Sequence, residues 1–247
     1  TTEIYTLSLH DALPIYRAFA LLDDVSPGTG SIPVTANYLQ LTAAAAEFGK
    51  GPSAASDEAR RILECLDRGR RLFDELVAPG TDVALVANGP TLRGKGLGRA
   101  IDGHRTVVRF NNHTGGSGLD DQGERTDIWI RSPYLEYVPL RTTEGLRLFV
   151  LTGANLTHRF SDGLEILRPF LATGIPVCVV PPEVYRSLHD TLDASPSCGL
   201  IGLKWVADRF GGTIDSRHVF GFSPGDNTSG RSRYYDGERV GRIPSRH

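Results

Sequence analysis

The sequence lacks any apolar run approaching the roughly 20 residues that a membrane-spanning helix needs, so we expect no membrane span in it. Its formal net charge of −2 gives no basic surface for nucleic acid or an anionic membrane. The three cysteines, Cys65, Cys178 and Cys198, offer neither a disulfide framework nor a metal-ligand spacing. Their use fits a reducing compartment, and we therefore expect a cytoplasmic protein.

The seven histidines include no HExxH pair or comparable spacing, so the sequence gives a zinc site little support. What the chain does contain is ordinary for a soluble globular protein, with 40% apolar and 23% charged residues. Its 247 residues are enough for one sizeable α/β domain.

Residues 1–15 are expected to be foreign to the natural protein. Glu3–Ile15, EIYTLSLHDALPI, resembles the translation of a sequencing-library adapter, and the alternative is a genuine N-terminal strand and turn. On the first interpretation the natural N-terminus is missing, and a signal or membrane anchor before it is left open.

Short apolar runs alternate with helical patterns along most of the chain. Residues 16–80 are expected to form a helical region, with helices over 41–48 and 56–77. Six strands are then expected at 83–87, 106–110, 127–130, 146–151, 177–180 and 218–222. Helices are expected at 97–102, 162–173, 182–192 and 199–210. This alternation predicts a single Rossmann-like α/β domain, its mostly parallel sheet covered by helices on both faces, in which 16–80 packs with 81–247.

A glycine-rich loop follows the first predicted strand. Gly94, Gly96 and Gly98 could bring backbone N–H groups close to a phosphate. Their G-x-G-x-G spacing departs from the dinucleotide pattern G-x-G-x-x-G, and the second strand ends in Asn111-Asn112 instead of an acidic residue. A nicotinamide enzyme is therefore disfavoured, whereas an amide at this place can hydrogen-bond phosphate or a base.

Three segments resemble a known family. NGPTLRGKGLGR at 88–99, with Ile101-Asp102, His104 and VRFN at 108–111, resembles the long motif of the sialyltransferases, glycosyltransferase family 29. GERT at 123–126 is similar to the end of that motif. SPSCGL at 195–200 resembles the short motif and RYYD at 233–236 the third. The matches cover most of 83–236.

The resemblance implies a variant of the A-type glycosyltransferase fold and a metal-independent, inverting transfer from a CMP-activated sugar. The sugar would be sialic acid, Kdo or a relative, the acceptor a glycan hydroxyl, and no cofactor, metal or nucleic acid would take part. The absence of a clear D-x-D pair agrees with metal independence, and Asp120-Asp121 is interpreted as a solvated turn.

The resemblance also implies a set of donor-binding residues: Asn88, Gly89, Asn111, Ser197, Cys198, Gly199, Arg233 and Tyr234. Asn88 and Asn111 would lie against the donor phosphate and nucleotide, and the alternative is that each only closes a turn. Ser197 and Gly199 begin a predicted helix, where they could bind phosphate or ribose, cap the helix, or do both.

The chain departs from the family pattern at several places. Arg233 replaces the third-motif histidine, and Val83 and Phe210 stand where animal members have a disulfide, which suits a bacterial-type cytoplasmic protein. The family's general base is the histidine of H-x-x-x-x-E, and only the last residue, His247, lies at a matching distance. His247 is thus either the catalytic base of a C-terminally truncated fragment or a terminal residue without a role. The second hypothesis for the whole chain is a nucleotide-binding pseudoenzyme or inactive fragment.

Overall fold

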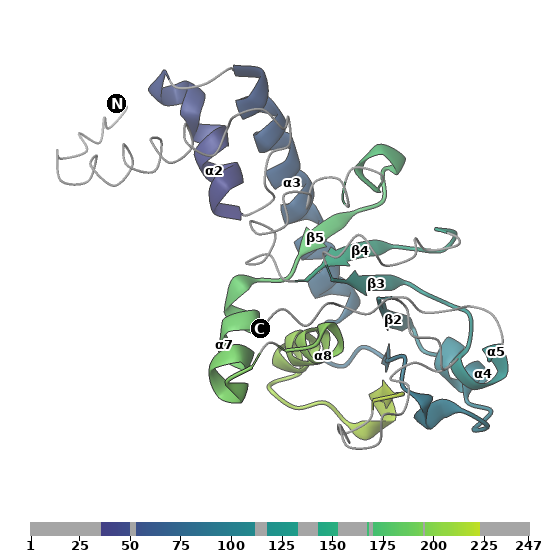
Figure 1. Cartoon of the computed structure of the whole chain (residues 1–247). Coiled ribbons are helices and arrows are strands. Elements are labelled where there is room, and N and C mark those ends of the chain that lie inside the picture. The colour runs from purple at the N-terminus through teal and green to yellow at the C-terminus, as the bar shows by residue number, and fades with distance from the viewer. Residues whose placement is uncertain are drawn as a thin grey trace, which may run out of the picture.

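The computed structural model describes residues 36–49, 53–111, 118–132, 143–152, 167, 170–194 and 196–222 (Figure 1). The adapter-like segment 1–15 and the predicted site residues Arg233, Tyr234 and His247 lie outside this set. Within it, no helix is both long enough and apolar enough to cross a membrane. The cytoplasmic location stays a prediction.

Six parallel strands form one sheet. They are β1 (Val83–Val86), β2 (Thr106–Phe110), β3 (Ile128–Arg131), β4 (Leu148–Leu151), β5 (Val177–Val179) and β6 (Val219–Phe220). The strand order is β5-β4-β3-β2-β1-β6, and every neighbouring pair is parallel. The chain therefore moves outward from β1 to β5 and then returns to place β6 on the other side of β1. The predicted fold class, a parallel α/β sheet with helices on both faces, is confirmed.

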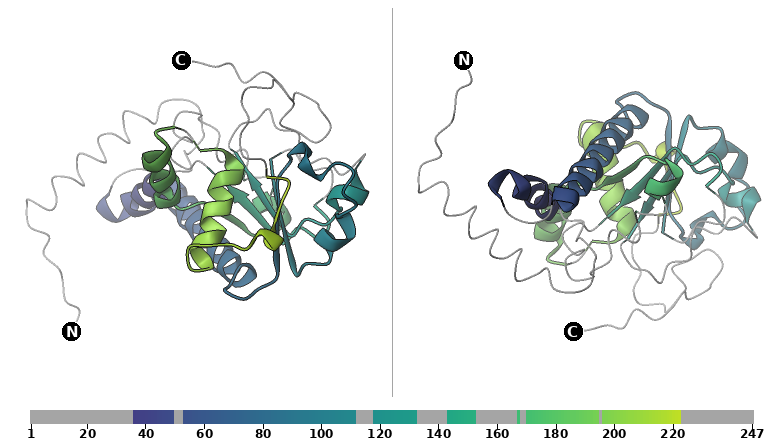
Figure 2. Two further views of the ribbon diagram at one scale, coloured as in Figure 1. Left: turned by 90° about the horizontal axis from the view of Figure 1, so that it is seen from below. Right: turned by 90° about the horizontal axis from the view of Figure 1, so that it is seen from above.

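The helices lie on both faces of the sheet. They are α2 (Ala36–Ala45), α3 (Ser53–Leu76), α4 (Gly98–Asp102), α5 (Leu119–Gln122), α7 (Pro182–Leu192) and α8 (Cys198–Arg209), with 3₁₀ turns η1 (Ala46–Phe48), η2 (Pro90–Leu92) and η3 (Ser216–His218). Figure 2 shows α8 on one side of the sheet and α4 with α5 on the other. Of the helix predicted over 162–173, residues 167 and 170–173 are described, and they are helical.

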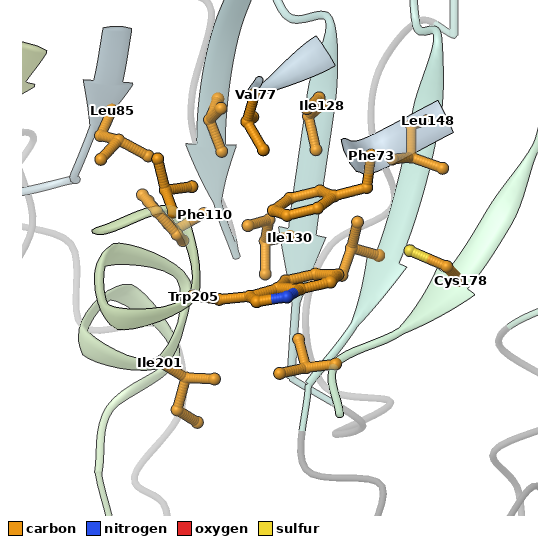
Figure 3. Close-up of a cluster of buried hydrophobic side chains, with 14 of the residues drawn as sticks. Phe73, Val77, Leu85, Phe110, Ile128, Ile130, Leu148, Cys178, Ile201 and Trp205 are labelled. Carbon is orange, nitrogen blue, oxygen red and sulfur yellow. The ribbon is translucent and has the colours of Figure 1, made fainter. Parts of the chain in front are cut away.

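One hydrophobic core joins α3 and α8 across the first face of the sheet. The rings of Phe73 from α3 and Trp205 from α8 stack at 3.5 Å between centroids. Figure 3 shows this pair lying over alternate residues of the strands, among them Ile128, Ile130 and Leu148. Because side chains alternate along a strand, the other residues face the opposite layer, where Trp129 and Phe149 pack with Phe170.

A glycine lets α3 pass unusually close to the edge strand β5. A Cβ atom on Gly69 would overlap the carbonyl oxygen of Val177, a backbone atom that cannot rotate away. Gly69 is buried in the second half of the helix. The close contact therefore fixes where α3 crosses the sheet and aligns Phe73, one turn later, with Trp205.

Replacing this glycine should destabilise the protein although alanine is the better helix former. Gly69→Ala gains about 1 kcal/mol of helix propensity but forces α3 off β5, which typically costs about 1–3 kcal/mol, so a net loss of stability is expected. Urea unfolding followed by Trp fluorescence measures it. Asp67→Ala, at an exposed position of the same helix, is the control and should leave stability unchanged or raised. A Gly69→Ala protein as stable as the parent would show that α3 does not depend on this approach.

Candidate functional site

A polar residue follows each of four neighbouring strands. Asn88, Asn111, Ser132 and Thr152 come after β1, β2, β3 and β4, and the parallel arrangement brings them to one edge of the sheet. This carboxyl edge is where open α/β sheets bind ligands, most often where the strand order reverses. Here the reversal lies between β1 and β6, next to Asn88.

Three of these side chains are bonded to the backbone of a neighbouring strand. The Nδ2 group of Asn88 donates to the carbonyl oxygen of Phe110 at 2.8 Å. The Oδ1 atom of Asn111 accepts from the backbone N–H of Ser132 at 3.0 Å, and the hydroxyl of Thr152 donates to the carbonyl oxygen of Arg131 at 3.2 Å. The polar edge is therefore an ordered part of the sheet.

Asn111 is held more firmly than a simple turn residue. Its backbone has a φ of +46°, a left-handed conformation that asparagine tolerates better than most residues. Its N–H donates to the carbonyl oxygen of Ile130 at 2.9 Å, and its own carbonyl oxygen accepts from the indole N–H of Trp129 at 2.8 Å. With Oδ1 bound to Ser132, the Nδ2 group has no acceptor among the described residues. This geometry leaves a fixed N–H₂ donor at the edge of the sheet.

The N-terminus of α8 lies against the same edge. Ser197 caps the helix, since its Oγ atom accepts from the N–H of Leu200 at 3.2 Å. The Cys198 thiol is buried and donates to the carbonyl oxygen of Ile130 at 3.6 Å. Burial raises its pKa to about 12, an effect that hydrogen bonds from Thr152, Ser132 and the backbone of Asn111 oppose. The side chain of Cys198 therefore anchors the helix as a neutral thiol. If Cys198 binds a ligand, the contact is expected from its backbone N–H.

The structure thus brings together residues that are far apart in the sequence. The Asn111 N–H and the Cys198 thiol both donate to the carbonyl oxygen of Ile130, and Ser197 and Gly199 adjoin Cys198. Asn88 joins this cluster through Phe110. Ser132 and Thr152 belong to the same cluster, and the sequence patterns did not predict them as site residues. The available signal was a single polar residue after each apolar run, which many turns also show.

Gly89 has a structural role that is visible in its contacts. Its N–H donates to the carbonyl oxygen of Gly221 at 3.1 Å, and a Cβ atom at Gly89 would overlap that oxygen. The glycine therefore lets the loop after β1 lie close to the end of β6. The N–H of Gly89 is therefore engaged within the protein. Its predicted contact with the sugar donor stays a prediction.

The glycine-rich loop binds a carboxylate of the protein itself. The N–H groups of Gly94 and Gly96, both with positive φ, donate to the two oxygens of Asp121, each at 2.7 Å. The interpretation of Asp120-Asp121 as a solvated turn is therefore wrong for Asp121, which is buried in α5, whereas Asp120 is exposed. Because this backbone concavity is filled, the loop is not a free phosphate site.

Two arginines of the segment 108–126 are also bound within the protein. Arg109 is buried, and its guanidinium donates to the carbonyl oxygens of Arg125 and Gln122 at 2.9 and 2.7 Å. Burial lowers the pKa of Arg109 to about 10, and the Asp102 carboxylate opposes the shift, so the group stays cationic at neutral pH. Arg125 donates to the carbonyl oxygens of Asp102 and His104. Both arginines therefore hold the loops between strands together.

Comparison with known proteins gives distant structural similarity only. No protein-family model matches the chain, and no curated protein matches it. A mammalian sialyltransferase in complex with Gal-beta-1-3GalNAc-ortho-nitrophenol is 18% identical and has a TM-score of 0.45, with 69% of each chain covered. A second crystal structure of a mammalian sialyltransferase is 18% identical over 71% of this chain and 70% of its own, with a TM-score of 0.46. The proposal for the function therefore rests on the residues of this chain.

Removing the charge that fills the glycine loop should destabilise the protein. Asp121→Asn leaves one acceptor oxygen for two N–H donors, so a loss of about 1–3 kcal/mol is expected. In a protein of this size that lowers the melting temperature by about 2–4 °C per kcal/mol, which differential scanning calorimetry resolves. Asp120→Asn makes the same chemical change at the exposed neighbour and should have no effect. Equal melting temperatures for the two variants would contradict a structural role for Asp121.

Proposed function

We propose that this chain is a glycosyltransferase that moves sialic acid or a related acid sugar from CMP to a glycan hydroxyl. The proposal combines the resemblance to the family 29 motifs with the arrangement of the carboxyl edge. The single observation that carries it is the meeting of Asn111 from the long motif with Cys198 from the short motif. The Asn111 N–H and the Cys198 thiol donate to the same carbonyl oxygen, that of Ile130, and Ser197 and Gly199 flank Cys198. Two segments that the resemblance assigns to one donor site are brought to one place.

The donor groups of this cluster suit a phosphate. The Nδ2 group of Asn111 has no acceptor among the described residues, and the same is true of the N–H groups of Cys198 and Gly199 at the start of α8. N–H groups in the first turn of a helix have no intrahelical acceptor, and the helix dipole favours an anion there by about 0.3–1 kcal/mol. We infer that these groups bind the CMP phosphate. Asn88 and Gly89 would line the bottom of the same site.

The remaining residues of the proposal come from the motifs alone. Arg233 would stabilise the leaving phosphate with a permanent positive charge, and Tyr234 would contact the donor. The acceptor hydroxyl would attack the anomeric carbon as the bond to the CMP oxygen breaks. His247 would accept the hydroxyl proton, so the products are the glycosylated acceptor, CMP and a proton held by imidazole. No metal or cofactor is required in this scheme.

The second candidate is a nucleotide-binding protein without transferase activity. The glycine loop and both arginines described above stabilise the fold. These residues would therefore be retained even in a protein that has no catalytic activity. Binding of CMP without sugar transfer would favour this candidate.

CMP binding tests the edge cluster directly. Asn111→Asp keeps the Oδ1 acceptor for Ser132 and tolerates the left-handed backbone, but it replaces the N–H₂ donor with a negatively charged oxygen. Loss of one hydrogen bond to a charged group, about 1.5–3 kcal/mol, corresponds to about a tenfold or greater loss of CMP affinity. Isothermal titration calorimetry measures the dissociation constant for parent and variant.

A matched control distinguishes the effect of changing Asn111 itself from the effect of adding one negative charge to the protein. Gln40→Glu adds the same charge at an exposed position of α2 and should leave CMP affinity unchanged. Far-UV circular dichroism and thermal unfolding check that Asn111→Asp is folded. If the folded variant binds CMP as tightly as the parent, Asn111 is not a donor-binding residue; a parent protein that binds no CMP overturns the proposed function.

The proposed base is tested by transfer. In a protein preparation that transfers sugar, His247→Ala should lower the rate of transfer by about 10²–10⁴-fold, because general base catalysis contributes that much. CMP affinity should change little, since the base contacts the acceptor. Transfer is followed by release of CMP from a panel of CMP-linked acid sugars with glycan acceptors. His189→Ala, at an exposed histidine of α7, is the control, and unchanged transfer by His247→Ala would exclude His247 as the base.

A further inference from the structure

Two histidines and an aspartate meet at the opposite, amino-terminal edge of the sheet. Asp82 directly precedes β1, His104 lies shortly before β2, and His218 is the last residue of η3 before β6. One donor atom of each residue lies within 4.8 Å of one donor atom of each of the others. The Nε2 atom of His104 is 3.6 Å from the Oδ1 atom of Asp82.

Hydrogen bonds fix the ring orientation of both histidines. The Nδ1 atom of His104 lies 2.9 Å from the carbonyl oxygen of Ala100, and the Nδ1 atom of His218 lies 2.7 Å from that of Val83. Since a carbonyl oxygen only accepts, each Nδ1 must carry the hydrogen. Each neutral imidazole then presents a lone pair at Nε2. A metal-binding histidine is held in the same way, with its other ring nitrogen donating to a carbonyl or carboxylate.

Packing restricts the two rings further. The ring of His104 lies edge-on to that of Phe220 at 5.4 Å and to that of His218 at 6.2 Å between centroids. His218 is buried and also packs against Phe210 at 6.0 Å. The two imidazoles are therefore preorganised, whereas the carboxylate of Asp82 is 59% exposed and free to adjust.

We propose that Asp82, His104 and His218 bind a divalent first-row transition metal ion, with Zn²⁺ as the best fit. Two imidazole nitrogens, one carboxylate oxygen and a water give the four ligands that zinc prefers. Ligand distances of about 2.1 Å around a tetrahedral ion place the donor atoms about 3.4 Å apart. A small movement of the exposed Asp82 side chain, together with slight approach of the two rings, closes the present separation.

The ion would act as a structural clamp. It would join the segments before β1, β2 and β6, and β6 is only two residues long and lies at the edge of the sheet. The site is about 20 Å from Asn88, since six residue steps of extended chain, each about 3.3 Å, lead from Asp82 to Asn88. The clamp is therefore separate from the proposed donor site, and metal-independent sugar transfer is compatible with it. The inference does not depend on the proposed function.

The test uses untagged protein freed of metal by a chelator. Isothermal titration with Zn²⁺ should show one site of micromolar or tighter affinity, and Co²⁺ should give the intense visible absorption of a tetrahedral site. Zn²⁺ should raise the melting temperature, because an ion that binds only the folded state stabilises it. Asp82→Ala, at an exposed side chain, should fold normally and lose at least tenfold in affinity for Zn²⁺.

Two further variants make the result decisive. His104→Gln should abolish the Co²⁺ spectrum. His189→Ala removes an exposed histidine that lies beside Asp190 on α7, with no third ligand near it in the described chain, and should bind Zn²⁺ like the parent. The proposal is overturned if the parent binds no Zn²⁺ at micromolar concentrations, or if Asp82→Ala and His104→Gln both bind it unchanged.

Discussion

The close packing of α8 on the carboxyl half of β2 and β3 is the contact on which the rest of this structure depends. Gly202 makes it possible, because a Cβ atom there would overlap the ring of Phe110. One turn earlier, the Cys198 thiol reaches the carbonyl oxygen of Ile130. The same helix position places Trp205 on Phe73 and so connects α8 to α3. A bulkier residue at 202 would lift the helix and separate its N-terminus from Asn111, so core packing and the candidate site depend on one contact.

The segment that resembles the long motif serves the fold more than the ligand. Asp121 neutralises the N–H groups of the glycine loop, and Asp102 accepts from the backbone N–H groups of Glu124 and Arg125. Asp121 is buried, and losing one partner of a buried charge is strongly destabilising, so such a residue is constrained by stability alone. A motif match over this segment therefore says much about architecture and less about chemistry. The residues proposed to bear on chemistry are the few at the sheet edge that still have an unused hydrogen-bond donor, such as the Nδ2 group of Asn111.

Local sequence patterns predicted most of the elements, because apolar runs and helix signals are local. The strand over 106–110 and the helix over 182–192 have the predicted bounds, and α8 begins one residue earlier than expected. What could not be predicted depends on tertiary contacts. The pattern did not reveal α5, since the Asp121 carboxylate is bound by a loop some 25 residues away in the sequence. The spacing of the histidines along the sequence showed no metal-binding motif. His104 and His218 are brought together only in the folded protein, where β6 pairs with β1.

The return of β6 connects the two edges of the sheet. His218, directly before β6, is bonded to the carbonyl oxygen of Val83. At the other end, the carbonyl oxygens of Phe220, the last residue of β6, and of Gly221 accept from the N–H groups of Ala87 and Gly89. A strand of two residues has few bonds of its own, so its docking is sensitive to what is bound at either end. An ion that binds only when β6 is docked favours the docked state, and it thereby orders the loop after β1 that leads to Asn88. Because such coupling is reciprocal in binding free energy, a ligand that needs the ordered loop would strengthen metal binding by the same factor. The edge strand is thus the element through which the proposed ion and the proposed donor site, on opposite edges of the sheet, would influence each other.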